Sequence, residues 1–513
     1  MNLLSNLWKK KQAFLLNPLF LSLIVFGILC LIFIFEMLKS NFAISSGYSY
    51  ETIAMSIIKG QGFSNPFSPA DTGPTSWMPP FIVWIYTLSY AIFGINLKSF
   101  IFLKIVDFLF ISSGIYLVLR TLKNIFSPKI YLIFLPLVLL FLYYYRGNTT
   151  SVFEDFGIYT LAFGVYISLA YILTHSQKIP LVYYLLLFVI GLSCPSLFLP
   201  LLLLFIVALF HELKNKYREN NKTFNFNIYL KSFYKYFFLG LPILIATFGW
   251  GYRNYVVFDK FIISKSNIWF EFYQANAESS NGLSSAVITA KTHPNENKAL
   301  CDTIIKYGGE QQWLDTYNQK SKLYLENESD DYLIKIKKRL FFSFVFTYYP
   351  YDKVKSKAIA GLSNKEKEIL NKYNIIRSNY WLTIFSKNDD TKVILDTYLP
   401  EKSTLLMKDL EECRQEYRSQ NMKKSYLFKG FLMSGIPFLS ALLLLFLRGR
   451  NIYILVLIIG YFSYELPYVL ISTYFRYQAV KFLLDSVIIS ILIYYIFQFF
   501  RKKNRYFNHK PIL

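Results

Sequence analysis

Long apolar stretches are the feature that most constrains this chain. A helix that crosses a bilayer needs about 20 mainly apolar residues, and roughly ten segments here meet that length or come close to it. Water cannot solvate so many apolar helices, so the sequence predicts a polytopic α-helical membrane protein. The stretches cover residues 14–35, 101–119, 130–145, 156–173, 180–193, 196–210, 236–250, 428–447, 452–470 and 479–499.

Composition excludes several other classes of protein. Of the 513 residues, 54% are hydrophobic and 17% are charged, which is too apolar for one soluble globule. The formal net charge is +23, but the basic residues flank apolar runs, so we read them as topology signals and exclude nucleic acid as a partner. The four histidines and four cysteines are too scattered for a zinc-type or nucleophile site. Cys301 and Cys413 could pair if their segment is extracytoplasmic, or they could remain thiols.

The basic clusters also predict the orientation of the chain. They fall on one side of the membrane if the apolar piece from Pro79 to Gly94 does not span. Its sixteen residues would reach only about 24 Å as a helix, and it opens with Pro79-Pro80, so we expect an interfacial or re-entrant helix. Both termini are then cytoplasmic, in the inner membrane of a cell. The outer face receives the first loop (36–100), an acidic loop (146–155), the segment 252–427 and the turn around Arg476.

Three parts follow from this topology. Residues 1–251 form an N-terminal transmembrane bundle that includes the first outer loop, and residues 428–513 form C-terminal transmembrane helices with a basic cytoplasmic tail. The polar stretch 252–427 has the length of an extracytoplasmic soluble domain, and we expect it to be mainly helical. Ser363 and Glu366 predict a capping box that opens a helix, and Leu405–Tyr417 is amphipathic.

The first outer loop has the best candidates for chemistry. Glu51 begins a short amphipathic helix near the bilayer surface, where a carboxylate can accept a proton from an incoming nucleophile. The alternative is that Glu51 merely complements a helix N-terminus. Gly60, Gly62, Pro79 and Pro80 predict an irregular backbone, which at membrane depth must be buried in protein or line a cavity. A rigid loop that covers the bundle is the alternative.

A series of short motifs in order along the chain resembles one family. The chain is similar to the protein O-mannosyltransferases and bacterial aminoarabinose transferases (glycosyltransferase family 39), which are C-type membrane glycosyltransferases that use polyprenyl-phosphate sugars. The acidic residue of the first loop is followed by Gly-x-Gly-aromatic and by Pro-Thr-x-x-x-Pro-Pro. The further matches are Gly251-Tyr252-Arg253-Asn254-Tyr255, Ser266-Asn267, Asn276, Gly309-Glu310 and Arg476-Tyr477.

The resemblance implies a C-type glycosyltransferase fold and a role for each matching residue. Glu51 stands at the position of the catalytic carboxylate, which is usually Asp in the mannosyltransferases. Glu154 or Asp155 matches a second acidic position. Arg253 and Arg476 match basic positions that meet the donor phosphate, although interfacial snorkelling is their alternative role.

The reaction implied is inverting transfer of a sugar from a polyprenyl-phosphate carrier to a lipid, glycan or protein acceptor. No cofactor is certain. The resemblance allows a divalent cation held between Glu51 and Glu154 or Asp155, but these acids alone define no metal.

Two other functions fit a chain of this kind. An O-antigen polymerase or ligase also pairs many helices with a large outer loop, but it would use a diphosphate-linked glycan and would not require the Glu51 loop. A transporter or flippase predicts charged residues within the helices and internal symmetry. The predicted spans are nearly free of acids, with Asp107 and Glu465 as the main exceptions, and no repeat is visible.

Overall fold

The chain is a multi-pass α-helical membrane protein, as predicted. The computed structural model describes residues 16–39, 48–67, 70–144, 155–219, 226–278, 293–294, 298–345, 361–372, 388–410, 431–472 and 480–507. These residues contain no β-strand, although an isolated bridge joins Ser64 to Pro74. Seven helices are long and apolar enough to cross a membrane: Pro18–Leu38, Leu97–Ile125, Phe156–Thr174, Pro195–Glu219, Tyr229–Phe258, Ile452–Leu470 and Phe482–Arg501.

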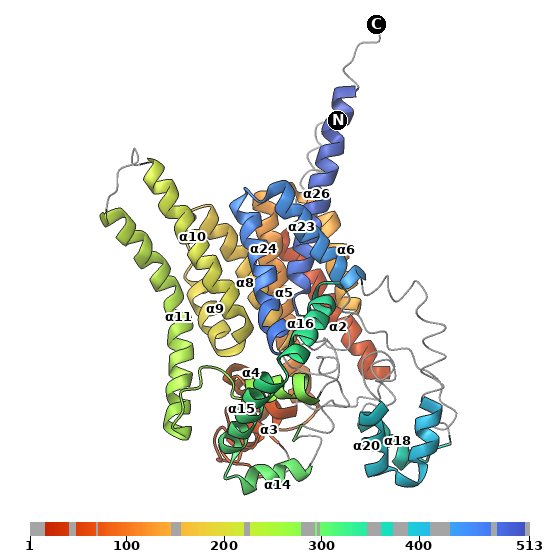
Figure 1. The fold of residues 1–513 in the computed structure, drawn as a ribbon. Coiled ribbons are helices and arrows are strands. Elements are labelled where there is room, and N and C mark those ends of the chain that lie inside the picture. Colours follow the sequence, from red (N-terminus) through yellow and green to blue (C-terminus); the bar gives the residue numbers. More distant parts are fainter. Residues whose placement is uncertain are drawn as a thin grey trace.

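The long helices stand together as one bundle, with α10 and α11 at one side of it (Figure 1). The seven spans lie in α2 (Pro18–Lys39), α5 (Leu97–Ile125), α8 (Phe156–Thr174), α10 (Phe198–Glu219) with the turn before it, α11 (Phe226–Phe258), α24 (Ile452–Leu470) and α26 (Phe482–Phe507). Short helical turns η1 (Pro128–Ile130), η2 (Pro195–Leu197) and η5 (Phe431–Gly435) precede α6, α10 and α23.

Three segments that the sequence predicts as spans are shorter helices. They are α6 (Tyr131–Tyr144), α9 (Val182–Ser193) and α23 (Ile436–Arg448). Helix α9 stops before Pro195 because a proline has no backbone N–H and disfavours helical geometry in the residue before it. Length and composition therefore identify seven clear spans, and the apolar pattern alone predicted roughly ten.

Helix α8 lies at the centre of the bundle and is buried along its whole length. It packs closely against α5 because glycines face each other at the crossing. A Cβ atom at Gly164 would lie 2.6 Å from the Gly114 Cα, and one at Gly114 would lie 2.5 Å from the Thr160 carbonyl oxygen. Small residues that let helix backbones approach are typical of membrane bundles.

Shorter helices lie at one end of the bundle (Figure 1). From the first loop come α3 (Tyr48–Ile58) and α4 (Pro80–Phe93), the latter being the piece expected to be interfacial or re-entrant. Helix α11 continues to Phe258, beyond the expected start of the soluble domain at residue 252. The later helices are α12 (Ile268–Tyr273), the π-helical turn η3 (Gln274–Glu278), α14 (Lys298–Lys306), α15 (Glu310–Asn327), α16 (Ser329–Phe344), α18 (Asn364–Lys372), α20 (Asn388–Tyr398) and the turn η4 (Pro400–Lys402).

The predicted capping box at the start of α18 is confirmed. Glu366 accepts hydrogen bonds from the Ser363 backbone at 2.8 Å and hydroxyl at 2.7 Å, and the Glu366 N–H donates to the Ser363 hydroxyl at 3.4 Å. Of the amphipathic stretch 405–417, residues up to 410 are helical and the rest lies outside the described residues. Cys301 is buried and its thiol donates to the Pro294 carbonyl at 3.4 Å, whereas Cys413 lies outside the described part, so their pairing stays a prediction.

Candidate functional site

Glu51 lies in the first turn of the short helix α3, as the sequence predicts. Tyr50, Ile53 and Ala54 bury one face of this helix in the protein, which leaves Glu51 partly exposed. The hydroxyl of Tyr90, on α4, donates to Glu51 Oε1 at 2.6 Å. This contact between two neighbouring helices fixes the direction in which the carboxylate points.

The chain after α3 folds back on itself as a compact hairpin, which we call the loop hairpin (residues 63–67 and 70–75). The Thr75 N–H donates to the Phe63 carbonyl at 3.1 Å, and the Ser64–Pro74 bridge lies next to this bond. Gly60 and Gly62 precede the hairpin with φ angles of 80° and 73°, a left-handed conformation that glycine adopts without steric cost. The predicted irregular backbone is therefore present at both glycines.

The loop hairpin is tied directly to the helix that carries Glu51. Thr52, the next residue, donates its hydroxyl to the Pro66 carbonyl at 2.9 Å. At the other end of the loop, Pro79 caps α4 and Pro80 is its first residue, which is the position where a proline costs no hydrogen bond. The position of Glu51 therefore depends on α3, α4 and the hairpin together.

Arg253, near the end of α11, holds the base of the loop hairpin. Its Nη1 donates to the Thr75 carbonyl at 2.8 Å, and its Nη2 donates to the Phe63 carbonyl at 3.1 Å. The guanidinium also lies 5.1 Å from the Trp250 ring centre and 5.3 Å from that of Phe63, within the range of cation–π attraction. In this structure Arg253 therefore braces the loop.

The buried carboxylate of Glu310 binds the end of the loop hairpin through hydrogen bonds from Thr75 and Ser76. Glu310, the first residue of α15, is 2% exposed and accepts a hydrogen bond from the Thr75 hydroxyl. The Ser76 N–H donates to it at 3.1 Å, the Ser266 hydroxyl at 2.8 Å and the Gln311 amide at 3.0 Å. Burial raises the pKa of the Glu310 carboxyl, and these hydrogen bonds oppose the rise because they favour the charged form.

Several motifs that are far apart in sequence thus meet at Thr75 and Ser76. Arg253 and Ser266 come from the end of α11 and the turn after it, and Glu310 comes from α15. Thr75 is 178 residues from Arg253 and 235 residues from Glu310 along the chain. In the sequence Glu310 stands out only as half of the Gly309-Glu310 pair. Tyr90 could not be predicted, because nothing in the local pattern indicates the partner of Glu51.

The other predicted site residues are only partly described. Asp155 immediately precedes α8, whose first turn packs against Asp107: a Cβ atom at Gly157 would lie 2.1 Å from Asp107 Oδ1. Glu154 and Arg476 lie outside the described residues, so their proposed roles stay predictions. Among the residues that are described, no group of three acidic, histidine or cysteine side chains could hold a metal ion, and we therefore derive no step through a cation.

The bundle contains more buried charged residues than the two acids, Asp107 and Glu465, that the sequence predicts within the spans. Asp107 pairs with Lys104 at 3.1 Å within α5. Lys481 lies 3.3 Å from Glu465 of α24 and 3.3 Å from Asp485 of α26, an acid that was not among the predicted exceptions. The side chains of these five residues are at most 2% exposed. Asp107 has Lys104 beside it, and Glu465 and Asp485 share Lys481.

No protein-family model, curated protein or solved structure matches this chain. What the site can do must therefore follow from its own residues: an oriented, partly exposed carboxylate on a short helix, in a loop that an arginine and a buried glutamate hold in place.

Proposed function

We propose that this chain is an inverting glycosyltransferase of the C-type fold. It would transfer a sugar from a polyprenyl-phosphate carrier to an acceptor at the extracytoplasmic face of the membrane. The observation that carries the proposal is the Glu51 carboxylate, partly exposed on α3 and oriented by the Tyr90 hydroxyl. A general base needs this combination of exposure to substrate and fixed direction.

The chemistry follows from the leaving group. Glu51 takes the proton from an acceptor hydroxyl or amine, and the freed lone pair attacks the anomeric carbon from the face opposite the phosphate. The bond between that carbon and the phosphate oxygen breaks, its electrons leave with the polyprenyl phosphate, and the configuration inverts. A phosphate leaves as a stable anion, so no general acid is required.

Arg253 and Arg476 are the groups proposed to meet the donor phosphate, because guanidinium forks suit phosphate oxygens. The contacts of Arg253 with Phe63 and Thr75 support a positioning role as well. Under this proposal one side chain links the donor to the backbone of the loop hairpin.

The test is transfer by purified full-length protein in bilayer nanodiscs, with a polyprenyl-phosphate sugar as donor. Glu51→Gln keeps the shape of the side chain but removes the base, and we expect transfer to fall by about 10²- to 10⁴-fold. The matched control is Asp71→Asn, which removes an exposed carboxylate from the same loop and should leave the rate unchanged. Wild-type turnover by a correctly inserted Glu51→Gln variant would show that Glu51 is not the base.

Transport is the alternative that one observation favours, namely the buried group of Lys481, Glu465 and Asp485 between α24 and α26. Ionisable residues inside a membrane bundle are often part of a transport pathway. A transporter moves its cargo without breaking a bond, so the appearance of free polyprenyl phosphate in the same assay separates the two functions.

A further inference from the structure

Helix α16 begins among the shorter helices at one end of the bundle, which we call the outer helices, and it ends against the bundle. It follows α15 after a single residue, Glu328. At its other end, the Phe344 ring lies 5.2 Å from the ring of Phe438, 5.9 Å from that of Tyr461 and 5.6 Å from that of Phe462. Figure 1 shows α16 rising from α15 to the side of α24. The sequence predicts an extracytoplasmic soluble domain for all of 252–427, which includes this helix.

The contacts with α24 give the depth that α16 reaches. Near its start, the Tyr332 hydroxyl donates to the carbonyl of Leu470, the last residue of the span Ile452–Leu470. Near its end, Phe344 contacts Tyr461, which lies nine residues further into that span. Nine residues of helix measure about 13 Å, or nearly half of a hydrocarbon core of about 30 Å. The last turns of α16 therefore lie beside the middle of a membrane span.

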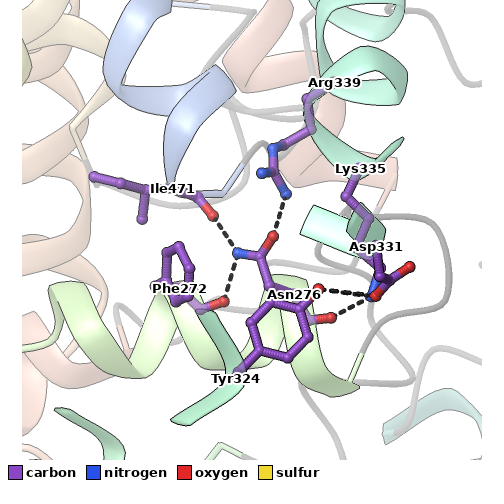
Figure 2. Close-up of polar contacts among 7 residues, drawn as sticks. All are labelled: Phe272, Asn276, Tyr324, Asp331, Lys335, Arg339 and Ile471. Atoms are coloured by element: carbon purple, nitrogen blue, oxygen red, sulfur yellow. Dashed lines mark hydrogen bonds and ion pairs between the residues drawn. The ribbon is translucent and has the colours of Figure 1, made fainter. Parts of the chain in front are cut away.

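One face of α16 is locked to the protein by a polar network (Figure 2). Arg339 is fully buried, and its Nε donates to the Val469 carbonyl at 2.6 Å while its Nη1 donates to Asn276 Oδ1 at 2.9 Å. Lys335, one turn earlier, donates to the Asn276 carbonyl and to Asp331 Oδ2. The Asn276 amide in turn donates to the Ile471 carbonyl at 3.0 Å. The network fixes the rotation of α16 about its own axis.

The opposite face is apolar and exposed, and it carries two lysines. Leu333, Ile334, Leu340 and Phe341 are 53%, 49%, 42% and 59% exposed. Lys337 and Lys338 lie between them and are also exposed. Side chains on a helix tilt toward its N-terminus, which for α16 is the end nearer the outer helices. Both lysines can therefore extend toward the membrane surface, while Leu340 and Phe341, which follow them along the helix, stay deeper.

We propose that α16 is partly inserted in the bilayer and that this face binds anionic phospholipids. Leu340 and Phe341 lie among the acyl chains, and Lys337 and Lys338 bind the headgroup phosphates. The depth of Phe344 beside α24 and the positive charge next to the apolar face support this occupant. The inference does not rest on the proposed sugar transfer.

Insertion is tested with a nitroxide attached at a single cysteine in the full chain, with the native cysteines replaced and the protein in nanodiscs. For Phe341→Cys we expect faster relaxation by membrane-soluble oxygen than by a water-soluble nickel complex. Glu326→Cys, at an exposed position of α15, should show the reverse. If nickel also dominates at position 341, α16 lies in water and the proposal fails.

The role of the lysines is tested by titrating detergent-solubilised full-length protein with a fluorescent phosphatidylglycerol. Each lysine near an anionic surface accounts for about fivefold in affinity, so Lys337→Gln combined with Lys338→Gln should weaken binding by about 25-fold. The control Lys306→Gln combined with Lys322→Gln removes the same charge from exposed positions on α14 and α15 and should have no effect. Equal losses in the two double variants, or none in either, would refute specific binding, as would equal affinity for phosphatidylcholine.

Discussion

Outside the bundle, the residues that the structure describes form two hydrophobic clusters that differ in origin. The first, which we call the loop cluster, combines Phe67 and Trp77 of the first loop with side chains of α12, α14 and α15, among them Phe270 and Trp313. The second, the distal cluster, draws all its buried members from one stretch of chain: Leu362, Leu370, Ile394, Leu395, Leu399, Leu406 and Leu410. In Figure 1, α18 and α20 lie apart from α12, α14 and α15.

The two clusters also differ in chemistry. The loop cluster is mainly aromatic, and the Trp77 ring alone lies 4.8 Å from that of Phe67 and 5.3 Å from that of Phe270. The distal cluster is aliphatic throughout its buried members. The loop cluster contains side chains of the first loop, and the distal cluster does not. We therefore expect a substitution in the loop cluster to change the position of Glu51 and the rate of transfer. A substitution in the distal cluster should change only the stability of that cluster.

The largest effect is expected from Trp77→Ala. Removing a buried tryptophan leaves a large cavity and costs about 3–5 kcal/mol of folding free energy. Since Trp77 follows Thr75 and Ser76 closely, the loop hairpin should loosen and sugar transfer should fall with it. Hydrogen exchange of residues 60–78 and the transfer rate are the measurements. Trp84→Ala removes a tryptophan that is 45% exposed on α4 and should change neither one; an equal effect of the two variants would contradict this role of the cluster.

Leu395→Ala applies the same kind of damage to the distal cluster. Leu395 is 1% exposed, so the lost packing should cost about 2–5 kcal/mol in that unit. Transfer per folded molecule should nevertheless match the wild type, because the two clusters have no member in common among the described residues. Local protection from proteolysis in 361–410 measures the first effect. The exposed neighbour Val393→Ala is the control, and a fall in transfer by Leu395→Ala alone would mean that the two clusters are coupled.

Glu310→Gln tests the polar attachment of the loop without opening a cavity. Disruption of the hydrogen bonds that the Glu310 carboxyl accepts from Thr75, Ser76 and Ser266 should cost about 1–3 kcal/mol. Burial raises the pKa of Glu310, so the stability that it contributes is complete below the unfolded-state pKa, about 4.3, and declines as the pH rises through the folded-state value. The gap in melting temperature between wild type and Glu310→Gln should therefore narrow as the pH rises above the unfolded-state pKa.

Glu326→Gln is the matched control for Glu310→Gln, since it changes an exposed glutamate on the same helix. A gap that widens as the pH rises would contradict the buried and strongly desolvated state of the Glu310 carboxyl.

Local sequence patterns were sufficient for much of the fold. Apolar length identified all seven clear spans. The short helix with Glu51 in its first turn and the capping box of Ser363 were also predicted, although that helix begins at Tyr48. Each of these features depends on residues within a few turns of one another. The apolar pattern overestimated the number of spans at α9 because a proline after its last turn limits its length.

The contacts that build the site could not be predicted in the same way. The hydrogen bond between Tyr90 and Glu51 joins two helices, and the carbonyl acceptors of Arg253 are backbone atoms that every residue has. Nothing in a single sequence marks which carbonyl an arginine will reach. For the same reason nothing in the sequence marks Arg339, which is fully buried and bonds to the Val469 carbonyl of α24.

The smallest effect is expected from Ser363→Ala, which breaks the cap of α18. Losing an N-cap costs about 1 kcal/mol of helix stability, and α18 contributes Leu370 to the distal cluster. Proteolysis of 361–410 should speed up slightly, and transfer should not change. Thr397→Ala is the control, because that hydroxyl bonds only back to the Val393 carbonyl of its own helix, at 2.7 Å, among the contacts described. A measurable loss of transfer would show that a change at the start of α18 alters the site at Glu51. The distal cluster would then not be independent of the site.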